Sequence, residues 1–312
     1  MSLPGRAVAV AAGLVADRAF GEPPSEVHPV AGFGRLMGTI EQQVWADDRG
    51  TGVLYTAAGV TTGIVMGRCA RSTAAAVALT CAGRELRATA SRIGSTLARG
   101  DLEGARRQLP ALVGRDPAGL DESGVAAAVI ESVAENSVDA VVAPALWGLL
   151  GGASGAWAYR AINTMDAMVG HRSSRYERFG WASARLDDAA NLVPARTCAA
   201  LVAAVRPGRA RHVLDVVRRD APAHPSPNAG VAEAAFAAAL GVELGGPLRY
   251  GDRSESRPAL GSGPRPGPAD IARAVTLADH VERALAGALI AGGLAALASR
   301  SVRQMTPTRS TR

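Results

Sequence analysis

The chain alternates between long apolar stretches and polar segments. Residues 140–159 carry no charged side chain over 20 positions, and residues 50–67 carry none over 18. A helix crosses a bilayer with about 17 to 25 mainly apolar residues, so both stretches are long enough. A third, residues 284–299, reaches that length if the flanking Arg283 and Arg300 extend toward the lipid head groups. The pattern predicts membrane-spanning helices, and we expect the protein in the membrane fraction.

The same pattern predicts an all-α protein, because Ala and Gly are abundant and β-branched alternation is scarce. We expect one helical, polytopic membrane domain over residues 1–300. Inside it, residues 251–270 are rich in Pro, Gly, Ser and Arg and predict a mobile loop. Residues 301–312 predict a disordered tail. The N-terminal apolar run leads into Asp17 without a small-residue cleavage site, so we expect no signal peptide.

Composition narrows the classes of function. The chain has 34 cationic residues, all of them Arg, and a net charge of +6. Without Lys there is no Schiff-base or P-loop lysine. The Arg residues are scattered and aromatic residues make up 4%, which disfavours nucleic acid as a partner. Cys69, Cys81 and Cys198 lie in apolar stretches without CxxC spacing, so we expect buried cysteines and no metal site there.

The first polar motif precedes the longest apolar stretch. In a helix, Glu131, Glu135 and Asp139 recur at i, i+4 and i+8 and share one face, with Asn136 beside them. Such like charges repel one another unless water or a cation compensates them. The motif is therefore either a solvated helix face or a site for Mg²⁺ or an ammonium group.

The second motif follows the same apolar stretch. Asn163 and Asp166 are helix neighbours at i, i+3, and His171 and Arg172 come next. Polar groups at the end of a span serve as interface anchors or as functional groups. For the lone His171 we favour packing or hydrogen bonding over metal ligation.

The third motif combines adjacent acids with an amide. Asp187 and Asn191 share a helix face, and Asp188 lies beside them. This set fits a Mg-nucleotide clamp, or simply acids placed at the positive end of a helix dipole. Pro194 is expected to kink or end that helix.

The fourth motif is a proline-rich loop. Three prolines within residues 222–227 preclude a helix there, and the loop carries His224, Ser226 and Asn228. A helix that starts after Asn228 leaves backbone N–H groups free for an anion.

Together these motifs resemble the CobD/CbiB family. The resemblance runs from about Leu14 to Tyr250 and rests on ordered segments such as E-S-V-A-E-N-S-x-D, N-T-M-D-A-M-V-G-H-R, S-A-R-L-D-D-x-x-N-x-x-P-A-R and A-P-x-H-P-S-P-N-A-G. It implies a multi-pass enzyme of the bacterial cytoplasmic membrane whose active site faces the cytoplasm. The implied reaction joins the corrinoid adenosylcobyric acid to aminopropanol phosphate with ATP and Mg²⁺, giving adenosylcobinamide phosphate. Other cobalamin-assembly enzymes are expected as handover partners.

We assign roles to the matching positions as hypotheses. The catalytic candidates are Glu135, Asp139, Asp166, Asp187, Asp188 and His224. Mg²⁺ is assigned to Asp139, Asp187 and Asp188. The candidates for binding ATP or substrate are Asp17, His28, Asn136, Asn163, His171, Arg172, Arg185, Asn191, Arg196, Ser226 and Asn228. Glu135, Asn136 and Asp139 are expected to meet Asp187, Asp188 and Asn191 in one pocket.

Two other functions stay open. Polar residues beside apolar helices also suit a membrane transporter of a small polar or corrinoid substrate, which would not couple ATP hydrolysis to amide formation. A soluble Ala-rich interaction bundle is the third reading, and membrane fractionation separates it from the others. If all motifs face the cytoplasm, residues 51–83 form a helical hairpin or do not cross the membrane.

Overall fold

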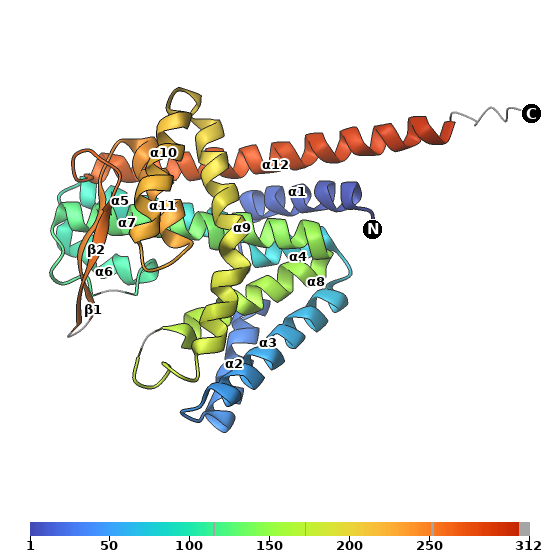
Figure 1. Ribbon diagram of the computed structural model, residues 1–312, viewed down its shortest axis with the longest axis horizontal. Helices are drawn as coiled ribbons and strands as arrows, with labels where there is room; N and C mark the ends of the chain where they lie inside the picture. Colours follow the sequence, from blue (N-terminus) through green and yellow to red (C-terminus); the bar gives the residue numbers. More distant parts are fainter. Residues whose placement is uncertain (115, 172, 251–252, 306–312) are drawn as a thin grey trace, which may run out of the picture.

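The computed structural model describes residues 1–114, 116–171, 173–250 and 253–305 and is mostly helical (Figure 1). The first six helices are α1 (Leu3–Phe20), α2 (Pro29–Val44), α3 (Arg49–Ala70), α4 (Thr73–Thr80), α5 (Gly83–Ala98) and α6 (Leu102–Gln108). The remaining ones are α7 (Glu122–Ser137), α8 (Ala143–Met165), α9 (Trp181–Val205), α10 (Ala210–Asp220), α11 (Ala229–Leu240) and α12 (Pro268–Met305). The prediction of a helical protein is confirmed.

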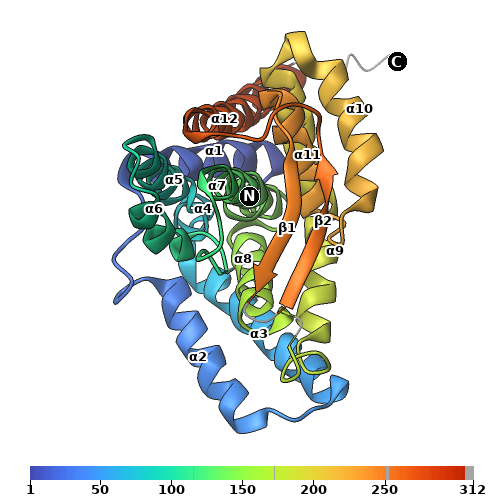
Figure 2. The ribbon, with the colours of Figure 1, turned by 90° about the vertical axis from the view of Figure 1, so that its left-hand side faces the viewer.

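The main core forms around α7, which is buried from Val125 to Ala134. Its small side chains let α5, α11 and α12 pack close to it. Figure 2 shows α5 and α6 on one side of α7 and α11 with the two strands on the other. A second apolar cluster, which includes Phe33, Tyr55 and Phe179, joins α2 and α3 to the end of α8. This packing holds the polar motifs between the two apolar clusters.

The longest apolar stretch does not form a single span. α8 breaks at Gly152, whose φ of 63° and ψ of −147° reverse the chain. The side chain of Asn163 then donates to Asp139 at 3.2 Å across 24 residues. In a straight helix these residues would lie about 36 Å apart. The prediction that residues 140–159 cross the membrane as one helix is therefore wrong, because glycine permits a turn that brings both ends back to one place.

A second reversal follows α3. The chain turns at Arg71, and α4 runs back until the N–H of Ala82 donates to the carbonyl of Ala140 at 3.0 Å. Along α3, glycines allow close contact with α8: a side chain at Gly67 would overlap the backbone of Ser154, and one at Gly63 would come within 2.8 Å of Ala161. Residues 51–83 thus form two consecutive helices, and their expected arrangement in the membrane stays a prediction.

Within the described chain, two helical segments are long and apolar enough to cross a membrane, Arg49–Ala70 and Pro268–Ser299. The second half of α12 extends beyond the other helices in Figure 1. Its exposed side chains Ile290, Leu294 and Leu297 are apolar.

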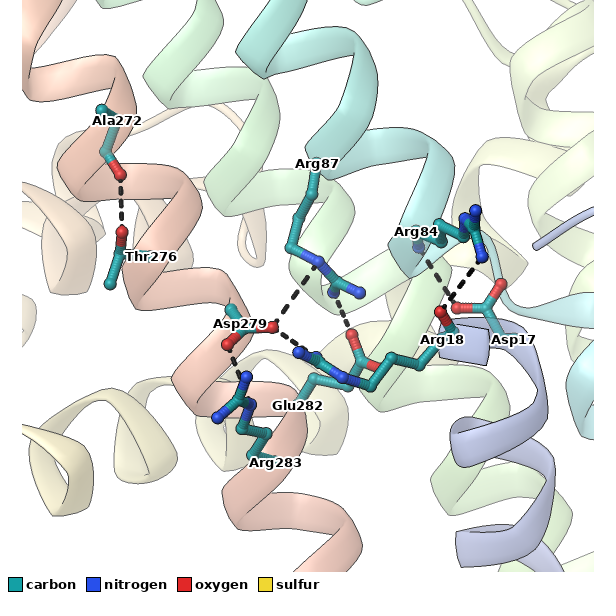
Figure 3. A network of polar contacts seen from close by, with 9 residues as sticks. All are labelled: Asp17, Arg18, Arg84, Arg87, Ala272, Thr276, Asp279, Glu282 and Arg283. Atoms are coloured by element: carbon teal, nitrogen blue, oxygen red, sulfur yellow. Dashed lines mark hydrogen bonds and ion pairs between the residues drawn. The ribbon is translucent and has the colours of Figure 1, made fainter. Parts of the chain in front are cut away.

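Ion pairs hold the first half of α12 in place (Figure 3). Arg18 of α1 pairs with Asp279, and Arg87 of α5 pairs with Glu282. Arg283 also pairs with Asp279, at 2.9 Å. Because Glu282 and Arg87 are largely buried, these contacts fix where α12 leaves the polar body of the protein.

Three local predictions are corrected. Part of the expected loop at residues 251–270 is instead a strand, β2 (Arg253–Leu260), which pairs antiparallel with β1 (Leu244–Tyr250); residues 251–252 lie outside the described chain. The pairing of Leu244 with Leu260 stabilises it, since both are fully buried. Of the expected disordered tail, residues 301–305 continue α12, and residues 306–312 lie outside the described chain. Cys69 is exposed, whereas Cys81 and Cys198 are buried as predicted.

We predict that both ends of the α8 hairpin face the same side of the membrane. Glu122 and Ala167 are exposed on either side of it in the sequence. In a Cys69→Ser background, Glu122→Cys and Ala167→Cys should react with an impermeant maleimide from the same side of sealed vesicles. Labelling from opposite sides would show that this stretch crosses the bilayer.

Candidate functional site

Three separate motifs meet around one small cavity. It has a volume of about 30 Å³, enough for a water or a small cation but not for a nucleotide. The polar side chains that line it come from the end of α7 and the π-helix after it, from α9 and from the loop before α11: Glu135, Asp139, Asp187, Asp188, Asn191, Ser226 and Asn228. The structure thus brings together five of the six residues expected to share a pocket.

The sixth, Asn136, points elsewhere, because it directly follows Glu135 in the regular part of α7 and so lies about 100° further round the helix. A π-helix over Val138–Val142 follows Ser137, so the i, i+4, i+8 register ends before Asp139. Asn136 donates to the carbonyl of Ser132 at 2.9 Å. Glu131 accepts the N–H of Gly245 at 2.9 Å and lines a second cavity of about 110 Å³, which Glu135 also borders.

Amide groups link the buried carboxylates. The Asn163 side-chain nitrogen lies 3.2 Å from Asp139 Oδ2 and 3.4 Å from Asp187 Oδ1. Asn191 donates to the other oxygen of Asp187 at 3.0 Å. Neutral donors thereby hold two like-charged groups near each other without cancelling their charge.

Two neighbours in α8 complete this network, and sequence reasoning missed both. The Tyr159 hydroxyl lies 2.9 Å from Asn191 Oδ1 and 3.3 Å from Asp139 Oδ1. Arg160 lies 3.5 Å from Asn163 Oδ1, which turns the amide nitrogen of Asn163 toward the carboxylates. Tyr159 ends the uncharged stretch, and Arg160 is the first charged residue after it. Their closeness to Asn163 in the sequence was the signal that could have identified them.

Burial and mutual repulsion set the protonation of the cluster. Burial raises the pKa of Asp139 far above its usual range, and Asp187 and Glu135 add to the rise. The pKa of Asp187 rises to about 6, mainly through burial, although hydrogen bonds from Asn191 and Asn163 oppose the rise. Burial, with Asp187 and Asp188 nearby, raises the pKa of Asp166 to about 7. The cluster therefore favours a proton or a bound cation.

The proline-rich loop forms the remaining wall. The Asn228 side chain donates to the carbonyl of Asp188 at 2.7 Å and accepts from Arg196 at 3.0 Å. Ser226 Oγ accepts the N–H of Ala229 at 3.1 Å, where α11 begins. These bonds tie the loop to α9, so the helix start predicted after Asn228 lies beside the cavity.

His224 lies behind this loop. Its Nδ1 accepts the N–H of Ser226 at 3.1 Å, and its Nε2 lies 3.7 Å from a carboxylate oxygen of Glu233. Both side chains are buried. Glu233, which sequence reasoning missed, also lies 3.5 Å from Arg257 of β2. His224 is thus placed to support the loop.

Asp17 and His28 lie outside the cavity and hold helix starts. Asp17 accepts the N–H of Arg84 at 3.2 Å near the start of α5, as Figure 3 shows. His28 Nδ1 accepts the N–H of Val30 at 3.1 Å and caps α2.

The other candidates also lie away from the cavity lining. Arg185 and His171 are exposed, and His171 packs edge-on against Tyr176. Asp166 begins a second π-helix, Asp166–Gly170. Arg172 lies outside the described residues.

The donor set fits Mg²⁺ only in part. Across the described ranges, no three His, Cys, Asp or Glu side chains are arranged to hold a metal ion. The three-carboxylate set of Asp139, Asp187 and Asp188 is therefore not preassembled, since amides occupy several of the carboxylate oxygens. Mg²⁺ commonly binds one or two carboxylates and completes its shell with water and phosphate. Asp139 and Asp187 fit that mode.

Comparison with known proteins identifies relatives over most of the chain. The family model described as CobD/Cbib protein matches residues 10–278. The chain is 47% identical to "Cobalamin biosynthesis protein CobD" of Mycobacterium tuberculosis (strain CDC 1551 / Oshkosh), covering 89% of this chain and 92% of the relative. It is 40% identical to the protein with that description in Geobacter metallireducens, covering 81% of this chain and 86% of the relative. No solved structure matches the chain.

Proposed function

Because the chain belongs to the CobD/CbiB family, we propose that it joins adenosylcobyric acid to aminopropanol phosphate in an ATP-dependent ligation during cobalamin biosynthesis. The curated relatives are described as cobalamin biosynthesis proteins. The balanced reaction converts the carboxylic acid, the amine and ATP into the amide, ADP and phosphate. The observation that carries the proposal is the pair of buried carboxylates, Asp139 and Asp187, which the side chain of Asn163 bridges by hydrogen bonds.

The charge of this pair matches the substrates. Buried carboxylates with raised pKa values gain most from a cation. Aminopropanol phosphate brings an ammonium group, and ATP arrives as a Mg²⁺ complex. Asp139 and Asp187 would hold Mg²⁺, which supplies charge neutralisation for the triphosphate when bound.

Activation of the acid is the chemical requirement that ATP meets. A carboxylate is a poor electrophile, and transfer of the γ-phosphoryl group onto it gives an acyl phosphate with phosphate as the leaving group. The amine must lose a proton before it attacks the carbonyl carbon. Our candidate for the base that accepts this proton is Asp166, which lies outside the cavity lining but near Asp187 and Asp188, and whose pKa burial raises to about 7.

The sequence places His224 among the catalytic candidates, and the structure supports a different role for it. Its Nδ1 is occupied by the N–H of Ser226, and its Nε2 faces the buried Glu233. We propose that His224 keeps the Ser226–Asn228 loop against the cavity. The loop's hydroxyl and amide then help to bind phosphate oxygens at the start of α11.

The test is synthesis with the purified protein in detergent. Adenosylcobyric acid, Mg-ATP and aminopropanol phosphate are incubated together, and mass spectrometry follows the amide product. We expect product only when all three are present, with one ADP formed per amide. Absence of amide from protein that is folded and membrane-inserted would refute the proposal.

The broken α8 beside a polar cluster also suits a transporter, because discontinuous helices line many substrate pathways. Uptake of corrinoid into proteoliposomes without ATP cleavage or amide formation would favour that function. Coupled ADP and amide formation in detergent, where no gradient exists, would exclude transport as the explanation.

A further inference from the structure

The two chain reversals border a further, open cavity, at the other end of the α8 hairpin from the carboxylate cluster. It has a volume of about 400 Å³ and lies between the start of α1, the turn from α3 to α4, and the turn of α8 at Gly152. The carboxylates lie at the open end of the hairpin, where Asp139 meets Asn163. This cavity lies at the closed end.

The lining is cationic. Arg6 and Arg71 both line the cavity, and among the residues that the structure describes no Asp or Glu does so. The guanidinium of Arg6 contacts the carbonyl of Leu150, and its Nε lies 3.8 Å from the position that a side chain at Gly152 would take. On the same side, the Thr73 hydroxyl lies 3.4 Å from that position. The missing side chain at residue 152 leaves this space open.

Helix α4 adds to the positive potential. It begins at Thr73, and its cap residue Ser72 accepts the N–H of Ala75 at 3.2 Å. The first backbone N–H groups of a helix have no partner within it, and the helix dipole is positive there. Two guanidinium groups and a helix start therefore border the same space.

The backbone of Arg71 is an independent observation. Arg71 adopts the left-handed conformation, with φ 52° and ψ −11°, and is the one residue other than glycine with positive φ in the described chain. Helix α11 ends in the same conformation with Gly241, at φ 73°. Glycine adopts this conformation at lower free energy than arginine. An arginine at this position therefore costs backbone strain, which indicates that its side chain has a role.

The surroundings indicate the kind of anion. Arg71 directly follows α3, one of the two segments long enough to span a membrane. Leu3 lies one helical turn before Arg6 in α1 and Leu150 directly precedes Gly151, both of which line the cavity, and the two leucines are 55% and 63% exposed. An arginine at the end of a membrane-spanning helix can bind a lipid phosphate, and exposed apolar side chains next to it can contact the acyl chains.

We propose that this cavity binds the phosphate of an anionic phospholipid, with Arg6 and Arg71 on the phosphate oxygens and Leu3 and Leu150 against the acyl chains. The site is separate from the carboxylate cluster and does not depend on the proposed ligation. A soluble phosphate compound shares the head-group chemistry, so the experiment must distinguish the two sources.

The experiment measures binding of short-chain phosphatidylglycerol to the full chain in detergent by titration calorimetry. We expect Arg71→Gln to weaken binding by at least about tenfold, because a charge-assisted, bidentate contact is lost. The matched control is Arg68→Gln: Arg68 is exposed, lies near the same end of α3 and does not line the cavity. It removes the same charge and should leave the affinity within about twofold, because Arg71 lines the cavity and Arg68 does not.

A second variant separates binding from folding. Arg71→Gly removes the backbone strain, so its unfolding temperature should equal or exceed that of the wild type while binding is lost. Inorganic phosphate is titrated in parallel and should bind far more weakly than the lipid. Equal affinity for inorganic phosphate would overturn the lipid assignment. Unchanged binding in Arg71→Gln, or equal weakening by Arg68→Gln, would overturn the site.

Discussion

Replacement of Asp187 or Asp139 by Asn should lower the rate of amide synthesis by roughly 10²- to 10⁴-fold, while the protein still folds and inserts. Each substitution keeps the size of the side chain but turns one acceptor oxygen into an NH2 donor, so Asp187→Asn also loses one of its two hydrogen bonds from Asn163 and Asn191. Each also removes the negative charge that the proposed Mg²⁺ and ammonium groups require. Steady-state synthesis at saturating Mg-ATP measures the loss.

The control for these variants is Asp215→Asn on α10. Asp215 is exposed and pairs with Arg218 at 3.3 Å, away from the cavity. Surface pairs of this kind contribute little to stability, so Asp215→Asn should keep wild-type activity and unfolding temperature. If Asp187→Asn and Asp139→Asn retain near-normal synthesis, these carboxylates do not hold the charge of the substrates.

The metal-free protein should become less stable as the pH rises from 5 to 8. The pKa of Asp187 is about 6 and that of Asp166 about 7 in the folded protein, against 3.8 for an ordinary Asp. Over this range the folded state holds protons that the unfolded state has released, so stability falls with rising pH. The unfolding midpoint should drop by roughly 5 °C between the two pH values.

One variant and one ligand test whether the carboxylate cluster causes this pH dependence. Asp187→Asn should flatten the pH dependence and raise the midpoint at pH 8, because it removes one of the buried charges. Mg²⁺ should raise the wild-type midpoint at pH 8 more than at pH 5, since the cation binds the ionised form. A midpoint that rises with pH over this range in the metal-free wild type would contradict the electrostatic account of the cluster.

The sequence predicted the helices and most of the site because local signals specify them. Spacing placed Asp187 and Asn191 on one helix face, and they do contact each other at 3.0 Å. The prolines of residues 222–227 correctly excluded an α-helix there, where a 3₁₀ turn and bends lead to α11. Order along the chain then identified the family.

The parts that failed depend on tertiary structure. The break in α8 rests on one Gly152 inside an otherwise uniform apolar stretch, and hydrophobicity alone does not separate a span from a hairpin. The π-helix at Val138–Val142 redirects Asp139 without a sequence signal. Helix α9 continues past Pro194, so this proline does not end the helix, which was one of the two outcomes expected there. The β-hairpin pairs residues with turn-like composition, and burial of Leu244 and Leu260 overrides that tendency.

The most direct test of ATP-dependent ligation follows the carboxylate oxygen. Adenosylcobyric acid labelled with ¹⁸O in the reacting carboxylate is incubated with the purified protein, Mg-ATP and aminopropanol phosphate, and mass spectrometry reads both products. The account predicts the amide together with inorganic phosphate that carries one ¹⁸O per amide, because the acid oxygen leaves on the transferred phosphoryl group. Amide formation without ¹⁸O in the phosphate, or corrinoid left unchanged while ATP is consumed, would contradict it.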